Sequence, residues 1–118
     1  MTIVTNALPY NMQIAVREYL DTDGASPFAR WFEKLNTPAA AKVGTSLYRL
    51  EQGNFSNVEG VGCGVYEYKI NFGAGYRIYF GKDGDELIIL LGGGSKKKQH
   101  ADIAKALACW QDYKERKC

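Results

Sequence analysis

Stretches of alternating hydrophobic and polar residues predict a sheet in the second half of the chain. Residues 65–72 and 76–81 alternate strictly, as strands do when their side chains point to opposite faces. The Gly-Ala-Gly sequence at 73–75 between them permits the tight turn of a hairpin. An Asp-Gly pair at 83–84 predicts a second hairpin, and the apolar run at 87–91 is typical of a strand buried on both faces.

The two faces of this predicted sheet differ in chemistry. Tyrosine, isoleucine and phenylalanine side chains alternate onto one face. The other face carries four charged or polar residues, Glu67, Lys69, Arg77 and Tyr79. Three consecutive lysines, Lys96–Lys98, follow the last strand. We therefore expect a charged sheet face beside a cationic turn.

Helical spacing of apolar residues appears in three other stretches. The first helix begins at the Ser-Pro pair at 26–27, because serine caps the free amides and proline fits the first turn. The second runs from about Pro38 to Gln52, with Thr37 as its start signal and Gly53 at its end. The third runs from Gln99 to about Glu115.

Two further strands complete the expected order of elements. Met12 to Tyr19 alternates and predicts a first strand paired with the main sheet, and a short strand is expected near residues 58–61. The resulting order β-α-α-β-β-β-α indicates an α+β fold with a mostly antiparallel sheet of about four to five strands. Two N-terminal helices and one C-terminal helix are expected against one face. Residues 1–118 fit a single domain.

The composition excludes several classes of protein. A hydrophobic content of 46% and a charged content of 24% are ordinary for a soluble globular domain, and no apolar run reaches the length of a membrane span. Three widely spaced cysteines imply neither a disulfide framework nor a zinc site, which favours the reducing cytoplasm. No cluster of metal ligands is present in the sequence, and we expect no cofactor. A net charge of +2 leaves only the local lysine cluster as a sign of an anionic partner.

The charged face has the groups that RNA cleavage needs. Attack by the 2′-hydroxyl requires a proton acceptor, a proton donor and cations that stabilise the charged phosphorane, and it needs no metal. Arg77 can contact a phosphate with two donors, and lysines add point charges. Glu67 is either the base or the ion-pair partner of Lys69, and a solvated face with structural ion pairs is the competing interpretation.

Other candidates carry weaker signals. His100, the only histidine, is either a surface residue or a proton carrier beside the lysines. Lys42 and Arg49 lie two helical turns apart on one outer face and extend the candidate cationic surface. The Gly-Gly-Gly-Ser-Lys stretch at 92–96 fails the phosphate-loop pattern, and its glycines are expected to lead the backbone away from the sheet.

Several motifs resemble the RelE/ParE superfamily of toxins, and within it the HigB-like branch of addiction module killer proteins. They are GNF at 53–55, GVYEYKINFGAGYRIYF at 64–80, LLGGGSKKKQ at 90–99 and Asp-Ile at 102–103. The most diagnostic part is the hairpin pattern G-x-G-Y-R-x-Y that begins at Gly73. The resemblance implies a RelE-like fold and runs from the first helix to the last.

The resemblance also implies a function. Such proteins are toxins that cut mRNA, commonly on the translating ribosome, and a small antitoxin holds them inactive. The family's active sites are basic, and the matching positions here are Lys69, Arg77 and Lys96, with Glu67 in the same cluster. Lys69 stands where this branch usually has arginine, and Ser95 stands where an aspartate usually precedes the lysine.

The expected roles follow from the residues and the resemblance together. Arg77 is expected to stabilise the scissile phosphate, while Lys69 and Lys96–Lys98 hold the RNA backbone. Proton transfer is open among three residues, Glu67, Tyr79 and His100. The expected partners are mRNA, the ribosome and a helix-turn-helix antitoxin, which would supply any DNA contact. The alternatives are a gyrase-poisoning toxin of the same fold and a relative that binds but has lost catalysis.

Overall fold

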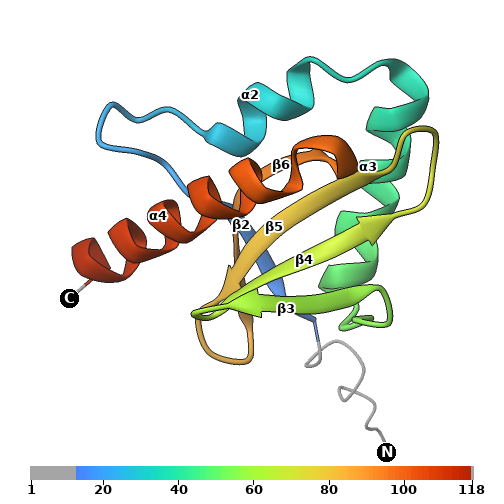
Figure 1. The fold of residues 1–118 in the computed structure, drawn as a ribbon. Helices are drawn as coiled ribbons and strands as arrows, with labels where there is room; N and C mark the ends of the chain where they lie inside the picture. The colour runs from blue at the N-terminus through green and yellow to red at the C-terminus, as the bar shows by residue number, and fades with distance from the viewer. Residues whose placement is uncertain (1–12, 118) are drawn as a thin grey trace, which may run out of the picture.

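The computed structural model describes residues 13–117, which form four helical segments and five strands (Figure 1). In chain order they are β2 (Ala15–Glu18), α2 (Pro27–Glu33), α3 (Thr37–Glu51), β3 (Val58–Gly62), β4 (Val65–Ile70), β5 (Tyr76–Lys82), β6 (Leu87–Ser95), a 3-10 turn (Lys96–Lys98) and α4 (Gln99–Lys117). The predicted α+β class and order of elements are confirmed, and the short strand expected near residues 58–61 is β3.

The five strands form one sheet in the order β2-β6-β5-β4-β3. Strand β2 runs parallel to β6, and the three other pairings are antiparallel. The first strand does pair with the main sheet as predicted, but it is shorter than the expected stretch, whose first residue, Met12, lies outside the described residues.

Helices cover both faces of the sheet, which corrects the expectation that all of them lie on one face (Figure 1). Helices α2 and α3 pack on the apolar face, where Tyr68, Ile78 and Phe80 are buried. Helix α4 packs on the opposite face, where Trp110 joins a second buried cluster. The physical reason is that this second face also carries apolar side chains, Val65 among them, and they need a cover.

Helices α2 and α3 each have a proline in the first turn, and in each the residue just before the helix caps its N-terminus. Ser26 Oγ accepts a hydrogen bond of 3.0 Å from the Ala29 amide, as predicted. The second helix is capped one residue earlier than expected: Asn36 Oδ1, and not Thr37, accepts the Ala39 amide at 2.9 Å. An asparagine oxygen is a better cap than threonine, and it moves the start to Thr37.

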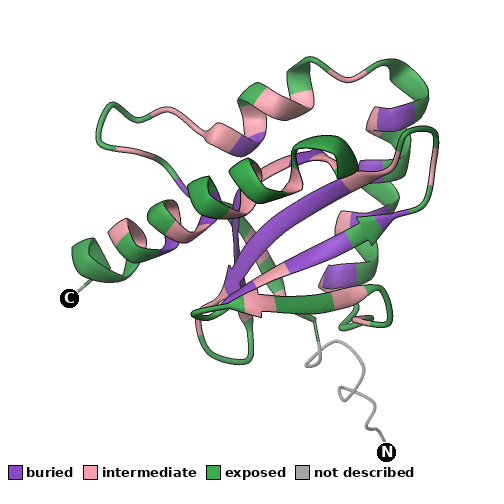
Figure 2. Cartoon of the chain, viewed as in Figure 1, coloured by how far each residue is buried: buried purple, intermediate pink, exposed green. Residues whose placement is uncertain are grey.

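Strand β6 continues to Ser95, so the glycines at 92–94 belong to the sheet and do not lead out of it as expected. A side chain at Gly93 would lie 2.2 Å from the Trp31 ring, and one at Gly94 would lie 1.9 Å from the Asp102 carboxylate. These glycines are therefore required because α2 and α4 approach the strand from its two faces. Among the described residues, the central strands are the most buried part (Figure 2). Within the described residues, no helix combines the length and apolarity that crossing a bilayer demands.

Candidate functional site

The register of β4 and β5 brings the predicted charged residues together on one face. Lys69 lies directly opposite Arg77, and Glu67 lies directly opposite Tyr79. Residues that face each other in an antiparallel pair have neighbouring side chains on the same side of the sheet. The sequence prediction of one charged cluster is therefore reproduced by the backbone. Its solvent exposure differs from what an open sheet face would give.

Glu67, Arg77 and Gln99 form a buried polar cluster beneath the start of α4. Arg77 Nε lies 3.4 Å from Glu67 Oε1, and the two side chains are only 11% and 3% exposed. The Gln99 amide donates to both carboxylate oxygens of Glu67, at 3.1 and 3.2 Å. Glu67 is thus the partner of Arg77, while Lys69 pairs with Glu59 at 2.5 Å, which corrects the proposed Glu67–Lys69 ion pair.

The tip of Arg77 reaches the end of the sheet beside the β4–β5 turn. A carbon added at Gly75 would lie 3.8 Å from Arg77 Nη1 and 3.6 Å from the Cβ of Lys96. The Lys96 amide also donates to the Gly75 carbonyl at 3.3 Å. The Arg77 guanidinium and the first carbon of the Lys96 side chain therefore both lie next to Gly75, where the absence of a side chain leaves room beside them.

The pKa values of two groups near this cluster, the Tyr79 hydroxyl and the Asp102 carboxyl, are raised. Burial raises the pKa of Tyr79, and the charges of Glu67 and Asp102 raise it further. Tyr79 is fully buried and its hydroxyl has no hydrogen-bond partner in the described part of the chain. Burial also raises the pKa of Asp102, against the opposing charges of Lys105 and Lys98. Tyr79 is therefore closed to solvent in this conformation.

The remaining predicted residues lie around the cluster. Lys69, Lys96 and His100 are exposed near it. Lys42 lies with its Nζ 5.4 Å from the centre of the Phe72 ring, which places it near the β4–β5 turn. Arg49 is in the last turn of α3 and is exposed, two turns further along the helix.

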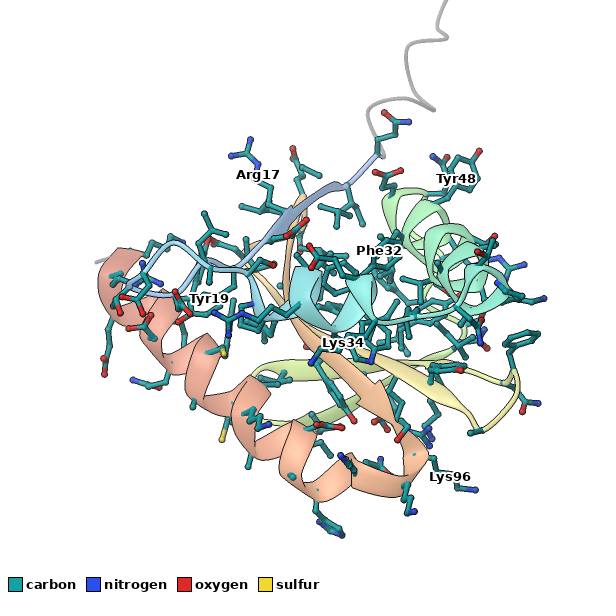
Figure 3. All side chains as sticks on the ribbon, turned by 90° about the horizontal axis from the view of Figure 1, so that it is seen from above. Arg17, Tyr19, Phe32, Lys34, Tyr48 and Lys96 are labelled. Atoms are coloured by element: carbon teal, nitrogen blue, oxygen red, sulfur yellow. The ribbon has the colours of Figure 1, made fainter. Side chains whose placement is uncertain are left out.

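The structure separates the three consecutive lysines. Lys96 lies beside Arg77, but Lys98 lines a cleft between α2 and α4 together with Lys34 and Asp102. Figure 3 shows Lys34 over the gap between these helices and Lys96 at the end where β6 turns into α4. The 3-10 turn causes this separation, because successive residues of a helical turn point in different directions.

Sequence reasoning missed the contributions of Gln99 and Glu59. The sequence places Gln99 only at the start of the last helix, yet it is the one residue of α4 that hydrogen-bonds Glu67 among the described contacts. Its position directly after the lysine run was the available signal. Glu59 had none, because β3 was recognised only as a possible short strand and its register was unknown.

Comparison with known proteins places the chain in a family and a fold. No protein-family model matches it. An uncharacterized protein of Haemophilus influenzae is 41% identical over 80 residues, which are 67% of this chain and 81% of that protein. The chain belongs to the family of that Haemophilus protein. Because this relative is itself uncharacterized, the family membership assigns no activity.

The fold of this family member is RelE-like. A mutant of the Escherichia coli toxin RelE in its free state superposes with a TM-score of 0.62, over 82% of this chain and 97% of the toxin, at 14% sequence identity. The RelE-like fold expected from the hairpin motifs is therefore confirmed. At this identity the likeness concerns the fold alone.

Proposed function

We propose that this family member is the toxin of a type II toxin–antitoxin system and cleaves mRNA on the ribosome, in the cytoplasm. The observation that carries the proposal is the convergence of Arg77 and Lys96 at Gly75, at the end of a RelE-like sheet. The hairpin motif that includes Arg77 is the part of the sequence most typical of the HigB-like branch. The Lys96 side chain begins next to the Arg77 guanidinium, so its ammonium group can join Arg77 at one phosphate, where positive charge stabilises the transition state.

In this proposal the cations position the phosphate and the 2′-hydroxyl performs the attack. Arg77 and Lys96 stabilise the phosphorane, while Lys97, Lys98, Lys69 and Lys42 form contacts to the RNA backbone. Arg49 lies further along α3 and contributes to the longer-range positive field.

Of the three candidate proton carriers, only His100 is open to solvent. Glu67 is 2% exposed and bonded to Gln99, and Tyr79 is completely buried. Histidine is the side chain that most often acts as a general acid or base in enzymes. We therefore assign proton transfer to His100 and regard Glu67 as the residue that holds Arg77 in place.

The proposed partners are an antitoxin and the translating ribosome. The antitoxin is a helix-turn-helix protein that blocks the toxin and supplies any contact with DNA. Among residues 13–117, no group of three histidine, cysteine or acidic side chains is arranged to bind a metal ion. The proposed cleavage uses only side chains and the RNA's own hydroxyl.

Inducible expression in bacteria tests the proposal. Growth and the 5′ ends of transcripts are followed for the wild type, for Lys96→Ala and for Arg17→Ala, whose side chain is exposed on β2 away from the cluster. Growth arrest with new mRNA ends is expected for the wild type and for Arg17→Ala, and a strong loss of both for Lys96→Ala. Because Lys96 is exposed, this variant should fold normally.

Arg77 is tested in a double variant that removes both charges of the buried pair, because removing Arg77 alone would leave the charge of Glu67 buried without a partner. The double variant Glu67→Gln/Arg77→Met should be folded and non-toxic. Arrest with intact mRNA and damaged DNA would instead indicate gyrase poisoning. Harmless expression of the wild type would indicate a binding protein without catalysis, an alternative that the enclosed Glu67 and Tyr79 favour.

A further inference from the structure

Strand β6 has a free edge over its second half. Its pairing with β2 ends at Leu90, opposite Glu18, whereas its pairing with β5 continues to Ser95. Within residues 13–117 no strand pairs with residues 91–95 on the β2 side. Alternate residues of a strand direct their backbone groups to opposite sides, so part of this segment's N–H and C=O groups point outward without a strand partner.

This edge lies in a cleft between α2 and α4. The cleft has a volume of about 740 Å³ and is bounded by Trp31 of α2, by residues 91–95 of β6 and by Ala106 of α4. The floor includes the glycines at 92–94, whose faces are covered by the Trp31 ring at Gly93 and by the Asp102 carboxylate at Gly94. An added strand would therefore pair with β6 in the plane of the sheet, along the edge that β2 leaves open.

The walls of the cleft are cationic. Arg30 and Lys34 line it from the α2 side, and Lys98 and Lys105 line it from the α4 side. Asp102 is the only carboxylate among the lining residues of the described chain. Arg30 lies 3.9 Å from Asp21, whereas no ion pair within 4.0 Å joins the three lysines to a described residue. An acidic occupant would complement this charge.

We propose that a protein partner adds an extended, acidic segment to the free edge of β6 between α2 and α4. Strand addition uses main-chain hydrogen bonds for affinity and side-chain contacts for specificity. The five residues 91–95 span roughly 16 Å, so the added strand has about five residues. Its acidic side chains contact Lys34 on one wall and Lys105 on the other.

A nucleic acid is the competing occupant of a cationic cleft. Strand-edge amides and carbonyls at regular spacing match a second peptide backbone, whereas a nucleic acid has no matching row of donors and acceptors. The proposal does not depend on RNA cleavage, because Arg77 and Lys96, the two residues proposed to stabilise the phosphorane, are not among the described residues that line the cleft.

Binding of a defined probe tests the proposal. The probe is a short fluorescent peptide of alternating glutamate and valine, and its counterparts are the same peptide with lysine for glutamate and a version N-methylated at alternate amides. The glutamate peptide should bind and slow hydrogen exchange at the amides of residues 91–95. The lysine peptide and the N-methylated peptide should bind at least about tenfold more weakly.

Charge-reversal variants supply the matched control. The double variant Lys34→Glu/Lys105→Glu should lower the affinity for the glutamate peptide at least about tenfold. The control Arg17→Glu reverses an exposed charge outside the cleft and should leave the affinity within about twofold. Absence of binding, binding without protection of residues 91–95, or stronger protection by a short single-stranded RNA would each overturn the proposal.

Discussion

The buried pair of Glu67 and Arg77 gives a prediction whose magnitude follows from the structure. At 3.4 Å and an effective dielectric constant of 20, the attraction between the two charges is about 5 kcal/mol before the cost of desolvation. Removing one partner of such a pair leaves a buried charge and costs about 3–5 kcal/mol. We therefore expect Arg77→Met to lower the free energy of unfolding by this amount, and the melting temperature by roughly 12–20 °C.

The double variant separates the ion pair from the rest of the packing. Glu67→Gln/Arg77→Met removes both charges while keeping similar volumes, and it should unfold within about 1 kcal/mol of the wild type. Lys69→Met is the matched control on the neighbouring strand, because Lys69 lies opposite Arg77 but is 46% exposed in its pair with Glu59. It should change stability by less than about 1 kcal/mol.

Urea denaturation followed by circular dichroism at neutral pH compares five proteins: the wild type, the single variants Glu67→Gln and Arg77→Met, the double variant, and the control Lys69→Met. The coupling energy between Glu67 and Arg77 should be about 3 kcal/mol or more. If Arg77→Met were destabilised by less than about 1 kcal/mol, or if the double variant were as unstable as the sum of the two single ones, the buried pair would not have the role assigned to it.

Two further predictions concern glycine contacts and protonation. Gly81→Ala would bring a methyl group to 2.4 Å from the Trp110 ring and should destabilise the protein by about 1–3 kcal/mol. Gly44→Ala, on an open helix surface, should stabilise the protein by about 0.5–1 kcal/mol in the same denaturation assay, because alanine favours the helix over glycine. Burial raises the pKa of Asp102 above its usual value, because the folded protein favours the neutral carboxyl group. The stability that this group contributes to the folded state is therefore fully present below about pH 4 and is lost as the pH rises through the folded-state pKa. The stability of Asp102→Asn relative to the wild type should therefore increase from about pH 4 to pH 7, and a difference independent of pH would contradict the shift.

Local sequence signals predicted most of the fold. Strict alternation identified β4 and β5, and the glycine turn between them specified a hairpin. The Ser-Pro signal located the start of α2 correctly because the cap is a contact between residues three positions apart. Thr37 was the wrong cap because two adjacent residues could both serve, and only the backbone conformation of Asn36 decides between them.

The sequence predicted which residues of β4 and β5 form the candidate site, but it did not predict that Glu67 and Arg77 are buried. Alternation placed Glu67 and Arg77 on one face, and the hairpin register then made them neighbours. Whether that face was open depended on α4, which is distant in sequence and follows the last strand. The same helix decided the partner of Glu67, because the Gln99 contact joins residues 32 positions apart.

The sequence by itself determined the strands, the helices and the residues that share each face, because these depend on periodicity and on contacts within a few residues. Only the tertiary structure decided which face α4 covers, which carboxylate pairs with which cation, and that β6 keeps a free edge in a cationic cleft. Those features depend on how distant elements dock. Docking depends on the total apolar surface that side chains such as Trp110 bury against distant elements, and a local sequence pattern does not determine that total.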